Sequence, residues 1–215
     1  KWNRSMPWTE MKNMTGIRGE ERKVKVLAIN SSARKDGNTA ILIEKIFEIL
    51  SKEGIETEML QLGGQVIEPC RACWACEGKK NCVHRKDSFY EIFEKMKEAD
   101  GIILGSPVYT ANISANMQAL LERASVVTDM NREKSLLRYK AGAAVTAARR
   151  GGALNALDAM NHFFLLQEMF IVGSSYWSMA YGQMPGDVRQ DIEGLHTVEV
   201  LGKNMAYLLK ALNVR

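Results

Sequence analysis

Two kinds of hydrophobic pattern alternate along this chain of 215 residues. Short runs rich in β-branched or small apolar residues are typical of strands, and apolar positions repeated at three- and four-residue steps are typical of one helix face. The short runs predict five strands, at residues 24–30, 56–62, 101–105, 141–148 and 169–176. The repeated steps predict five helices. The first begins at Asn38, the second spans about 87–98, the third ends at about 128, the fourth spans 152–168 and the fifth spans about 191–213.

The alternation of strands with helices predicts the layers of the fold. A strand–helix–strand unit forms a right-handed crossover, so five such strands build a parallel sheet with helices on both faces. The continuous apolar run GIILG at 101–105 indicates a strand buried on both faces, and the alternating run at 56–62 indicates an edge strand. The fold class is therefore α/β. We expect ligands beyond the carboxyl ends of the strands, where the strand order switches.

Length and composition fit a single globular domain. Apolar residues make up 46% of the chain and charged residues 25%, which allows a normal core and disfavours disorder. No run approaches the ~18 apolar residues of a membrane helix, and no apolar segment typical of a signal peptide follows the first basic residues. We therefore expect the cytoplasm, a reducing compartment where clustered thiols more often bind metals or react than form disulfides.

The net charge of +4 comes from the start of the chain. Residues 1–25 hold seven of the 29 basic side chains and three of the 25 acidic ones, which leaves 22 of each for the remainder. A neutral body argues against nucleic acid as a partner, because that partner selects a basic face. We divide the chain into an N-terminal arm, 1–23, and a body, 24–215. The arm is a solvated tail or a subunit-packing segment, and Trp2 and Trp8 favour packing.

The loop after the first strand, NSSARKDGNTA at 30–40, has the composition of a phosphate site. Its donors and glycine lie at a helix start, whose free N–H groups and positive dipole end face the same spot. The loop contains neither GxxxxGK[ST] nor GxGxxG, so a monophosphate such as FMN fits better than other nucleotides. The alternative is an ordinary helix cap with turn residues. The candidates are Ser31, Ser32, Arg34, Gly37, Asn38 and Thr39.

Two later loops suit a flat ring at the same end of the sheet. GSPVYTANIS, 105–114, combines a proline-fixed turn with the aromatic face of Tyr109 and the amide of Asn112. TAARRGGALN, 146–155, combines two arginines that suit the N1–O2 edge of a flavin with a glycine pair that allows close approach. A Ser–Pro turn and a flexible surface loop are the alternatives. The common position of the three loops favours a flavin.

All four cysteines lie in one stretch, CRACWACEGKKNC, within a loop that we place at 66–86. The spacing C-x2-C-x2-C-x5-C lets three thiolates converge from a tight turn while a fourth closes the site, as in compact runs that bind a [4Fe–4S] cluster. Structural zinc usually takes two CxxC pairs ~12 to 20 residues apart, and a redox disulfide leaves two thiols over. Zinc, with His84 as a spare ligand, and a redox dithiol remain alternatives. The candidate ligands are Cys70, Cys73, Cys76 and Cys82, and we expect them at the flavin end because the loop follows the second strand.

The chain resembles the iron–sulfur flavoproteins of anaerobic archaea and bacteria, within the flavodoxin-like, NAD(P)H-dependent FMN reductase group. The resemblance rests on SSARKDGNT, CRACWACEGKKNC, GIILGSPVYTANISANMQALLER, ARRGG and GDVRQDIEGLHTVEVLGKNM, which span about residues 24–210. It implies a flavodoxin-like, doubly wound five-stranded parallel sheet of order 2-1-3-4-5, one FMN and one [4Fe–4S] cluster per subunit. It also implies a homodimer or homotetramer in which the cluster of one subunit lies near the flavin of a neighbour.

The resemblance assigns the site residues as well. It implies phosphate contacts for the six candidates of the first loop and cluster ligation for the four cysteines. It implies ring contacts for Pro107, Val108, Tyr109, Thr110, Asn112, Ala148, Arg149, Arg150, Gly151 and Gly152. No side chain is assigned as a catalytic acid or base, because the cofactors carry the reaction.

We therefore expect an oxidoreductase that contains FMN and a [4Fe–4S] cluster. The resemblance implies electron transfer between a donor, either a ferredoxin-like one-electron carrier or NAD(P)H, and an acceptor such as ferredoxin, a quinone, oxygen or peroxide. One alternative is a cluster-free NAD(P)H-dependent FMN or quinone reductase. The other is a non-catalytic electron carrier or metal-binding module.

Overall fold

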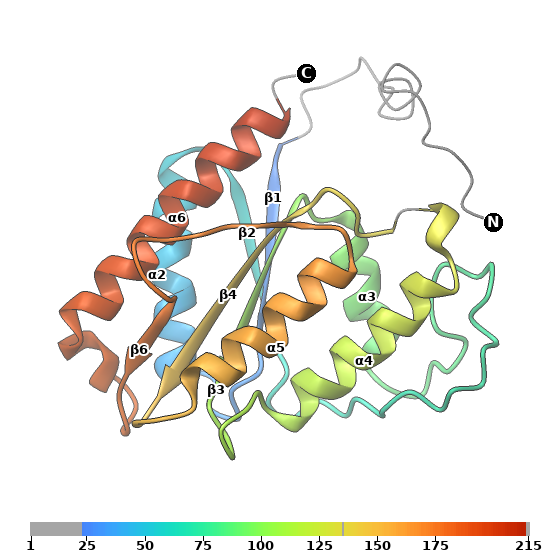
Figure 1. Ribbon diagram of the computed structural model, residues 1–215, viewed down its shortest axis with the longest axis horizontal. Coiled ribbons are helices and arrows are strands. Elements are labelled where there is room, and N and C mark those ends of the chain that lie inside the picture. The colour runs from blue at the N-terminus through green and yellow to red at the C-terminus, as the bar shows by residue number, and fades with distance from the viewer. Residues whose placement is uncertain (1–22, 135, 214–215) are drawn as a thin grey trace.

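The computed structural model describes residues 23–134 and 136–213 (Figure 1). The strands are β1 (Lys25–Asn30), β2 (Glu56–Gln61), β3 (Gly101–Pro107), β4 (Ala141–Ala148), β5 (Phe170–Ile171) and β6 (Met179–Tyr181). The helices are α2 (Asn38–Lys52), α3 (Phe89–Glu98), α4 (Ala115–Asp129), α5 (Ala153–Leu166) and α6 (Ile192–Asn213), with short 3₁₀ helices η1 (Arg132–Lys134) and η2 (Asp187–Gln190). The predicted arm, 1–23, lies outside the described residues except for Lys23.

The strands form a parallel sheet in the order β2-β1-β3-β4-β5, which confirms the predicted doubly wound topology. β2 stands at one end of this order and is half-buried along most of its length, as its alternating pattern predicted. The residues of β3 before Pro107 are buried, in agreement with the continuous apolar run. β4 has the bounds that its run of small residues predicted.

Helices cover both faces of the sheet (Figure 1). One core lies between the sheet and α3, α4 and α5, and a second lies between the sheet and α2 and α6. The small residues of β4 allow its helices to approach closely: a Cβ on Gly142 would meet the ring of Phe164 at 2.8 Å. The two cores fix the strands, and with them the loops at the strand ends.

The fifth strand differs from its predicted span of 169–176. β5 pairs only with Ala141 and Gly142, after which the chain leaves the sheet and returns as β6 beside the end of β4. The intervening segment contains Gly173, Ser174 and Ser175, small residues with low strand propensity. The Ser174 hydroxyl donates to Thr197 O on α6 (2.5 Å). A side-chain bond thus replaces strand pairing there.

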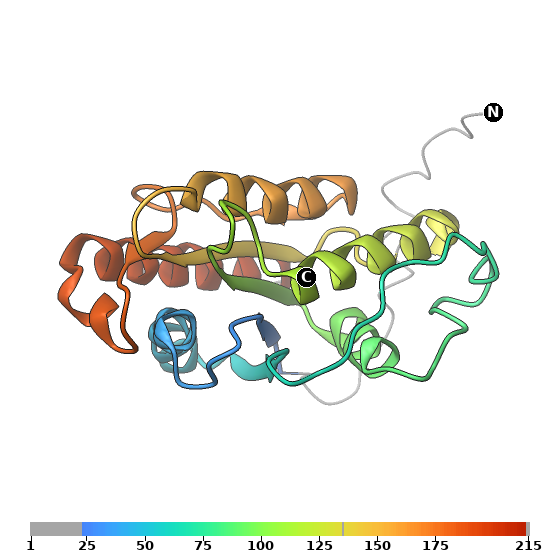
Figure 2. The same ribbon diagram turned by 90° about the horizontal axis from the view of Figure 1, so that it is seen from below.

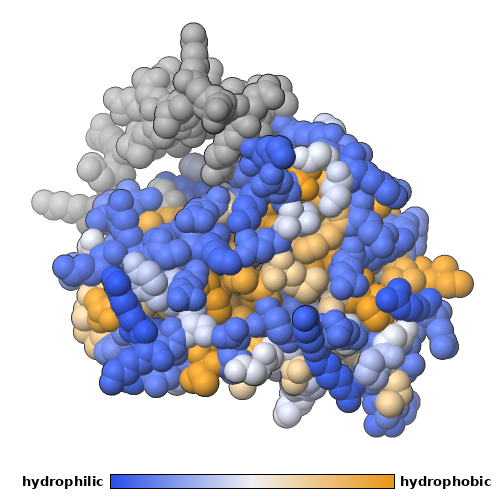
Figure 3. All heavy atoms as spheres, turned by 180° about the vertical axis from the view of Figure 1, so that it is seen from behind, coloured by the Kyte–Doolittle hydropathy of each residue, from blue (hydrophilic) through white to orange (hydrophobic). Residues whose placement is uncertain are grey.

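The carboxyl ends of the strands meet at the lower edge of the molecule in Figure 1, and Figure 2 views the protein from that end. Seen from behind, hydrophilic residues cover most of the surface and hydrophobic ones show mainly in a central band (Figure 3). None of the helices in the described ranges combines the length and apolar character that a membrane crossing requires.

Candidate functional site

The loop between β1 and α2 is a compact turn held by main-chain and side-chain bonds. Ser32 N–H donates to Asn30 Oδ1 and Arg34 N–H donates to Ser32 Oγ, both at 3.1 Å. Ser31 N–H donates across to Gly105 O at the end of β3 (2.9 Å). The turn is therefore anchored to two neighbouring strands and presents its side chains beside the start of α2.

Polar groups of this turn lack partners that a phosphate would supply. The Ser31 hydroxyl is buried without a hydrogen-bond partner among the described residues, which is costly unless a ligand provides one. α2 begins after Gly37 without a side-chain cap, so its first N–H groups and positive dipole end remain available. A Cβ on Gly37 would lie 3.2 Å from Arg34 O, so glycine allows the turn to close. These features fit a monophosphate.

Asn38 is used differently from the prediction, because its side chain is already engaged. Its Nδ2 donates to Met184 O (3.0 Å) and its Oδ1 accepts from Gly186 N–H (2.8 Å). Arg34 Nη1 lies 3.5 Å from Gln183 O in the same loop. The amide of Asn38 is therefore engaged within the protein, and Thr39 is buried beside it. The loop after β6, residues 182–187, thus joins the site although the sequence did not point to it.

The loops after β3 and β4 pack against each other. Tyr109 and Asn112 exchange two main-chain bonds, of 2.9 and 3.0 Å, around a tight turn. The two central residues of the turn, Thr110 and Ala111, have φ of +50° and +56°. Gly152 has φ +92°, and a Cβ there would lie 2.7 Å from Ala111 Cα. Consecutive left-handed non-glycine residues store strain of the kind found at ligand clamps.

This pair of loops presents the predicted ring contacts at the ligand end of the sheet. Pro107, Val108 and Gly152 are half-buried, and Ala148 is the buried last residue of β4. The outer part of both loops is exposed and consists of Tyr109, Thr110, Asn112, Arg149, Arg150 and Gly151. Beneath them the Thr146 hydroxyl is buried without a partner among the described residues. The loops combine an aromatic face, two cations and an unsatisfied hydroxyl, a set that fits a polar heterocycle.

The cysteine loop begins at the ligand end but does not stay there. Asn116, in the first turn of α4, donates through Nδ2 to the carbonyls of Leu62 and Gln65 at 3.2 and 3.1 Å. The loop then follows α4: Cys70 N–H donates to Glu122 Oε1 (2.9 Å) and Asn131 Nδ2 donates to Cys76 O (3.0 Å). Figures 1 and 2 show it extended beside α4, away from the other loops. The expectation that the thiols lie at the ligand end is therefore wrong, because α4 binds the loop along its length.

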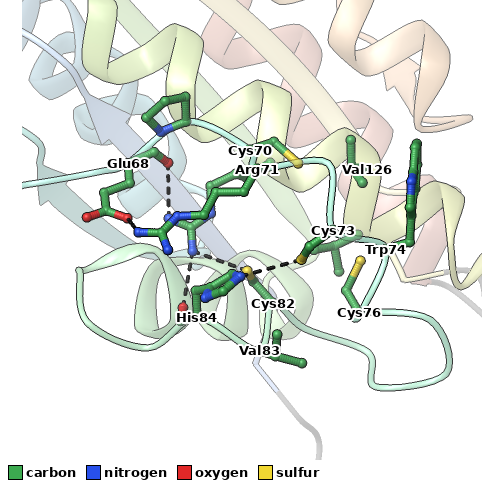
Figure 4. Close-up of a pocket in the computed structure, with 13 residues that line it drawn as sticks. Glu68, Cys70, Arg71, Cys73, Trp74, Cys76, Cys82, Val83, His84 and Val126 are labelled. Atoms are coloured by element: carbon green, nitrogen blue, oxygen red, sulfur yellow. Dashed lines mark hydrogen bonds and ion pairs between the residues drawn. The ribbon is translucent and has the colours of Figure 1, made fainter.

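The four predicted ligands line one hollow on the flank of α4. Cys76 is buried, Cys70 and Cys82 are half-buried, and Cys73 is exposed; all four are free thiols. Figure 4 shows their sulfur atoms around one space, with Trp74 and Val126 on one side and His84 on the other. Within the ranges described, no three His, Cys, Asp or Glu side chains converge on a point suited to a single metal ion.

The loop surrounds these sulfurs with donors. Ala72 and Trp74 adopt left-handed φ values of +48° and +57° between the cysteines, and backbone turns of this kind form the anion-binding concavities of many iron–sulfur sites. Ala72 N–H donates to Cys70 Sγ (3.4 Å), and His84 Nε2 lies 3.4 Å from Cys73 Sγ. His84 therefore lies within hydrogen-bond distance of one sulfur, and among the described residues it does not complete a site for a single metal ion.

The hollow disfavours a negative charge on its buried thiol. Burial raises the pKa of the Cys76 thiol, a backbone hydrogen bond lowers it, and the neighbouring Cys82, Cys70 and Cys73 raise it further. Cysteine binds a metal as the thiolate, so a metal bound in this hollow would displace the proton of Cys76. Four sulfurs around one hollow, one of which accepts from the Ala72 N–H, fit a cluster with four iron corners.

α4 separates the two regions. Its N-cap, Ser114, belongs to the loop after β3, whereas Arg123, nine residues later, lines the hollow of the cysteines. At a rise of 1.5 Å per residue, these two residues lie about 14 Å apart along the helix axis. No sequence motif pointed to Arg123, which lines the hollow, or to Asp87, the buried carboxylate that pairs with it.

Comparisons with known proteins agree on one family. The family model described as NADPH-dependent FMN reductase matches residues 24–183. An iron–sulfur flavoprotein of Methanocaldococcus jannaschii is 38% identical over 194 residues, covering 87% of this chain and 98% of the relative. An iron–sulfur flavoprotein of Methanosarcina thermophila is 31% identical over 189 residues, covering 87% of this chain and 96% of that one.

A solved structure supports the fold. The flavodoxin, WrbA-like protein from Agrobacterium tumefaciens matches with a TM-score of 0.58 at 18% identity, covering 88% of this chain and 98% of that one. At this identity the likeness concerns the fold alone, and it is the flavodoxin-like fold that the sequence predicted.

Proposed function

Because the chain belongs to the NADPH-dependent FMN reductase family, and within it to the iron–sulfur flavoproteins, we propose that it is an oxidoreductase that binds FMN and a [4Fe–4S] cluster. The observation that carries this proposal is the gathering of four free cysteines around one hollow, in a chain whose ligand end fits a flavin monophosphate. When bound, FMN supplies one- and two-electron chemistry and the cluster supplies one-electron transfer.

The residues of the ligand end hold and orient the flavin in this proposal. Ser31 and the first N–H groups of α2 bind the phosphate, and Arg34 adds charge at the rim. The exposed face of Tyr109 contacts the ring, and Arg149 and Arg150 favour the charge that gathers at the N1–O2 edge on reduction. No acid or base side chain is needed, since electrons and hydride move between cofactors and partners.

The electron donor and the electron acceptor are part of the same proposal. The donor is a ferredoxin-like carrier or NAD(P)H, and the acceptor is ferredoxin, a quinone, oxygen or peroxide. Lys79 and Lys80 border the cysteines and suit an acidic carrier. We further propose a homodimer or homotetramer, and a reducing compartment such as the cytoplasm, where four neighbouring thiols stay free.

Anaerobic purification followed by assays for flavin, iron and acid-labile sulfide tests the proposal. FMN together with iron and sulfide supports it. FMN with zinc, or with no metal, indicates the cluster-free reductase, and a colourless protein indicates the metal-binding module. If both cofactors are present, steady-state oxidation of NADH or of reduced ferredoxin separates an enzyme from a carrier.

A reciprocal pair of variants tests whether the two sites are separate. Cys73→Ala removes an exposed ligand, so we expect loss of iron and sulfide with FMN retained. Arg34→Glu places a carboxylate at the phosphate turn, so we expect loss of FMN with iron and sulfide retained. Loss of both cofactors from either variant, with an unchanged circular dichroism spectrum, contradicts two independent sites.

A further inference from the structure

A buried guanidinium lies against one of the four thiols. Arg123, in the third turn of α4, is 3% exposed. Its Nη2 donates to Cys82 Sγ at 3.3 Å and to His84 O at 3.1 Å. One guanidinium nitrogen thus holds both the last cysteine of the motif and the main chain two residues beyond it.

The other side of the guanidinium holds the start of the same loop. Nη1 donates to Glu68 O at 3.1 Å and forms an ion pair with the carboxylate of Asp87. The guanidinium carbon lies 4.1 Å from the centroid of the Phe89 ring. The planar group therefore joins the segments before the first cysteine and after the last, and its orientation is fixed by stacking.

Arg123 makes more hydrogen bonds than its ion pair with Asp87 alone requires. Arg123 and Asp87 have side chains only 4% exposed, and burying such a pair carries a desolvation cost that attraction alone often fails to offset. Burial by itself lowers the pKa of Arg123, but the bonds to Cys82 and Asp87 raise it above its ordinary value. Arginine stays protonated in proteins, so the guanidinium is charged, and it directs one of its N–H groups at a sulfur atom.

We propose that Arg123 is a positioning residue for the cluster: it holds Cys82 as the fourth ligand, and its N–H···S bond raises the reduction potential of the cluster. Reduction adds negative charge to the cluster and its sulfurs. A charged donor at one sulfur stabilises the reduced state more than the oxidised one, and burial keeps water from screening the effect. This inference rests on the proposed function, because it requires that a cluster be bound.

A second arginine of the same hollow provides a matched control. Arg71 also lines the hollow, but its side chain is 55% exposed and it pairs with the carboxylate of Glu68. Arg71→Gln removes a positive charge near the sulfurs without removing a bond to Cys82. Arg123→Lys keeps the charge but loses the fork of donors. The double variant Asp87→Asn with Arg123→Gln removes both charges together and leaves no buried carboxylate unpaired.

The experiment is a dye-mediated redox titration of the holoprotein, in which the reduced cluster is followed by electron paramagnetic resonance. At the wild-type midpoint, we expect the ratio of reduced to oxidised cluster to fall about tenfold in the double variant, which is 59 mV for a one-electron couple, and to fall by less in Arg123→Lys, which keeps the positive charge. In Arg71→Gln we expect a change of about twofold or less, because an exposed charge is screened. Iron and sulfide per chain, bound FMN and circular dichroism are measured on each variant.

The results of these measurements distinguish the role of Arg123 from the proposed function. A folded, FMN-containing Arg123 variant that has lost its sulfide also supports the proposal, since Cys82 then needs the guanidinium to be held in place. Wild-type sulfide content together with a wild-type potential in both Arg123 variants overturns it, as does an equal fall in Arg71→Gln. A wild-type protein that contains FMN but no acid-labile sulfide refutes the proposed function instead.

Discussion

Two adjacent glycines after β4 differ in the space that surrounds them. Gly152 has φ +92°, and a Cβ there would lie 2.7 Å from Ala111 Cα, whereas Gly151 has nothing within 4 Å of its Cβ position. Gly152→Ala is therefore expected to destabilise the protein by about 1–3 kcal/mol and to weaken FMN binding, because the two loops at the ring must separate. Gly151→Ala is the matched control and changes both quantities little. Urea unfolding and fluorescence titration with FMN measure the two effects, and equal results for both variants refute the packing argument.

Glu58 gives a prediction about pH, because it connects three elements of the fold. Its carboxylate pairs with Lys25 on β1 (2.6 Å) and with Lys95 on α3, and bonds to Lys25 and then Lys95 lower its pKa despite burial. The lowered pKa means that the stabilisation is present above the unfolded value, about 4.3, and is lost as the pH falls through the folded value. Glu58→Gln should thus cost about 1 kcal/mol at pH 7, and the cost should disappear in acid.

Chemical denaturation of wild type and Glu58→Gln across pH 3 to 8 measures this difference. Glu56→Gln is the control, because Glu56 lies on the same strand and its ion pair within the described residues is with the exposed Lys23, at 3.2 Å. It should change stability by less than about 0.5 kcal/mol at every pH. A Glu58→Gln cost that stays constant down to pH 3 contradicts the role given to the ionised carboxylate.

Among the elements, those with a strong periodic pattern were predictable. The bounds of β4 and the start of α2 agree with the pattern of small and apolar residues, since each element buries its own apolar face. The interruption between β5 and β6 could not be predicted, although Gly173, Ser174 and Ser175 stand inside the predicted strand. What replaces strand pairing there is a bond from Ser174 to Thr197 on α6, and pairing between such distant positions leaves no local signal.

The same distinction applies to the site. Loops at the carboxyl ends of parallel strands lie together by topology, so the sequence could predict that the loops after β1, β3 and β4 meet at one edge of the sheet. The anchoring of Asn38 by the loop at 182–187 depends on contacts 146 and 148 residues apart, and no local pattern announces them. Arg123 did leave a signal: it stands three residues after Leu120 and four before Val127, both buried, and a charged residue on an apolar stripe indicates a buried partner.

In the whole molecule, the position of the cysteine hollow matters more than its composition. The proposed flavin end lies at the N-terminus of α4, whereas the hollow lies about 14 Å along the helix by its rise per residue. The hollow also opens outward, because Cys73 is exposed and Trp74 is 56% exposed. Within one subunit the hollow and the proposed flavin end are separated along α4, while a neighbouring subunit can approach the open side of the hollow. This arrangement favours transfer between subunits of the proposed oligomer.

Subunit complementation tests that route. Chains carrying Arg34→Glu and Cys73→Ala, each with a different affinity tag, are co-expressed and the mixed oligomer is isolated anaerobically. Neither chain alone holds both cofactors, so each homo-oligomer should show no transfer from cluster to flavin. In the mixed dimer, rapid-mixing absorbance after reduction of the cluster should give about half the wild-type amplitude of flavin reduction, because a twofold dimer has two equivalent routes and the mixed one keeps one. Transfer within a subunit gives none in the mixed dimer, since no chain then carries a complete pair. A mixed oligomer that contains both cofactors but shows no flavin reduction therefore places the route inside one subunit, along α4.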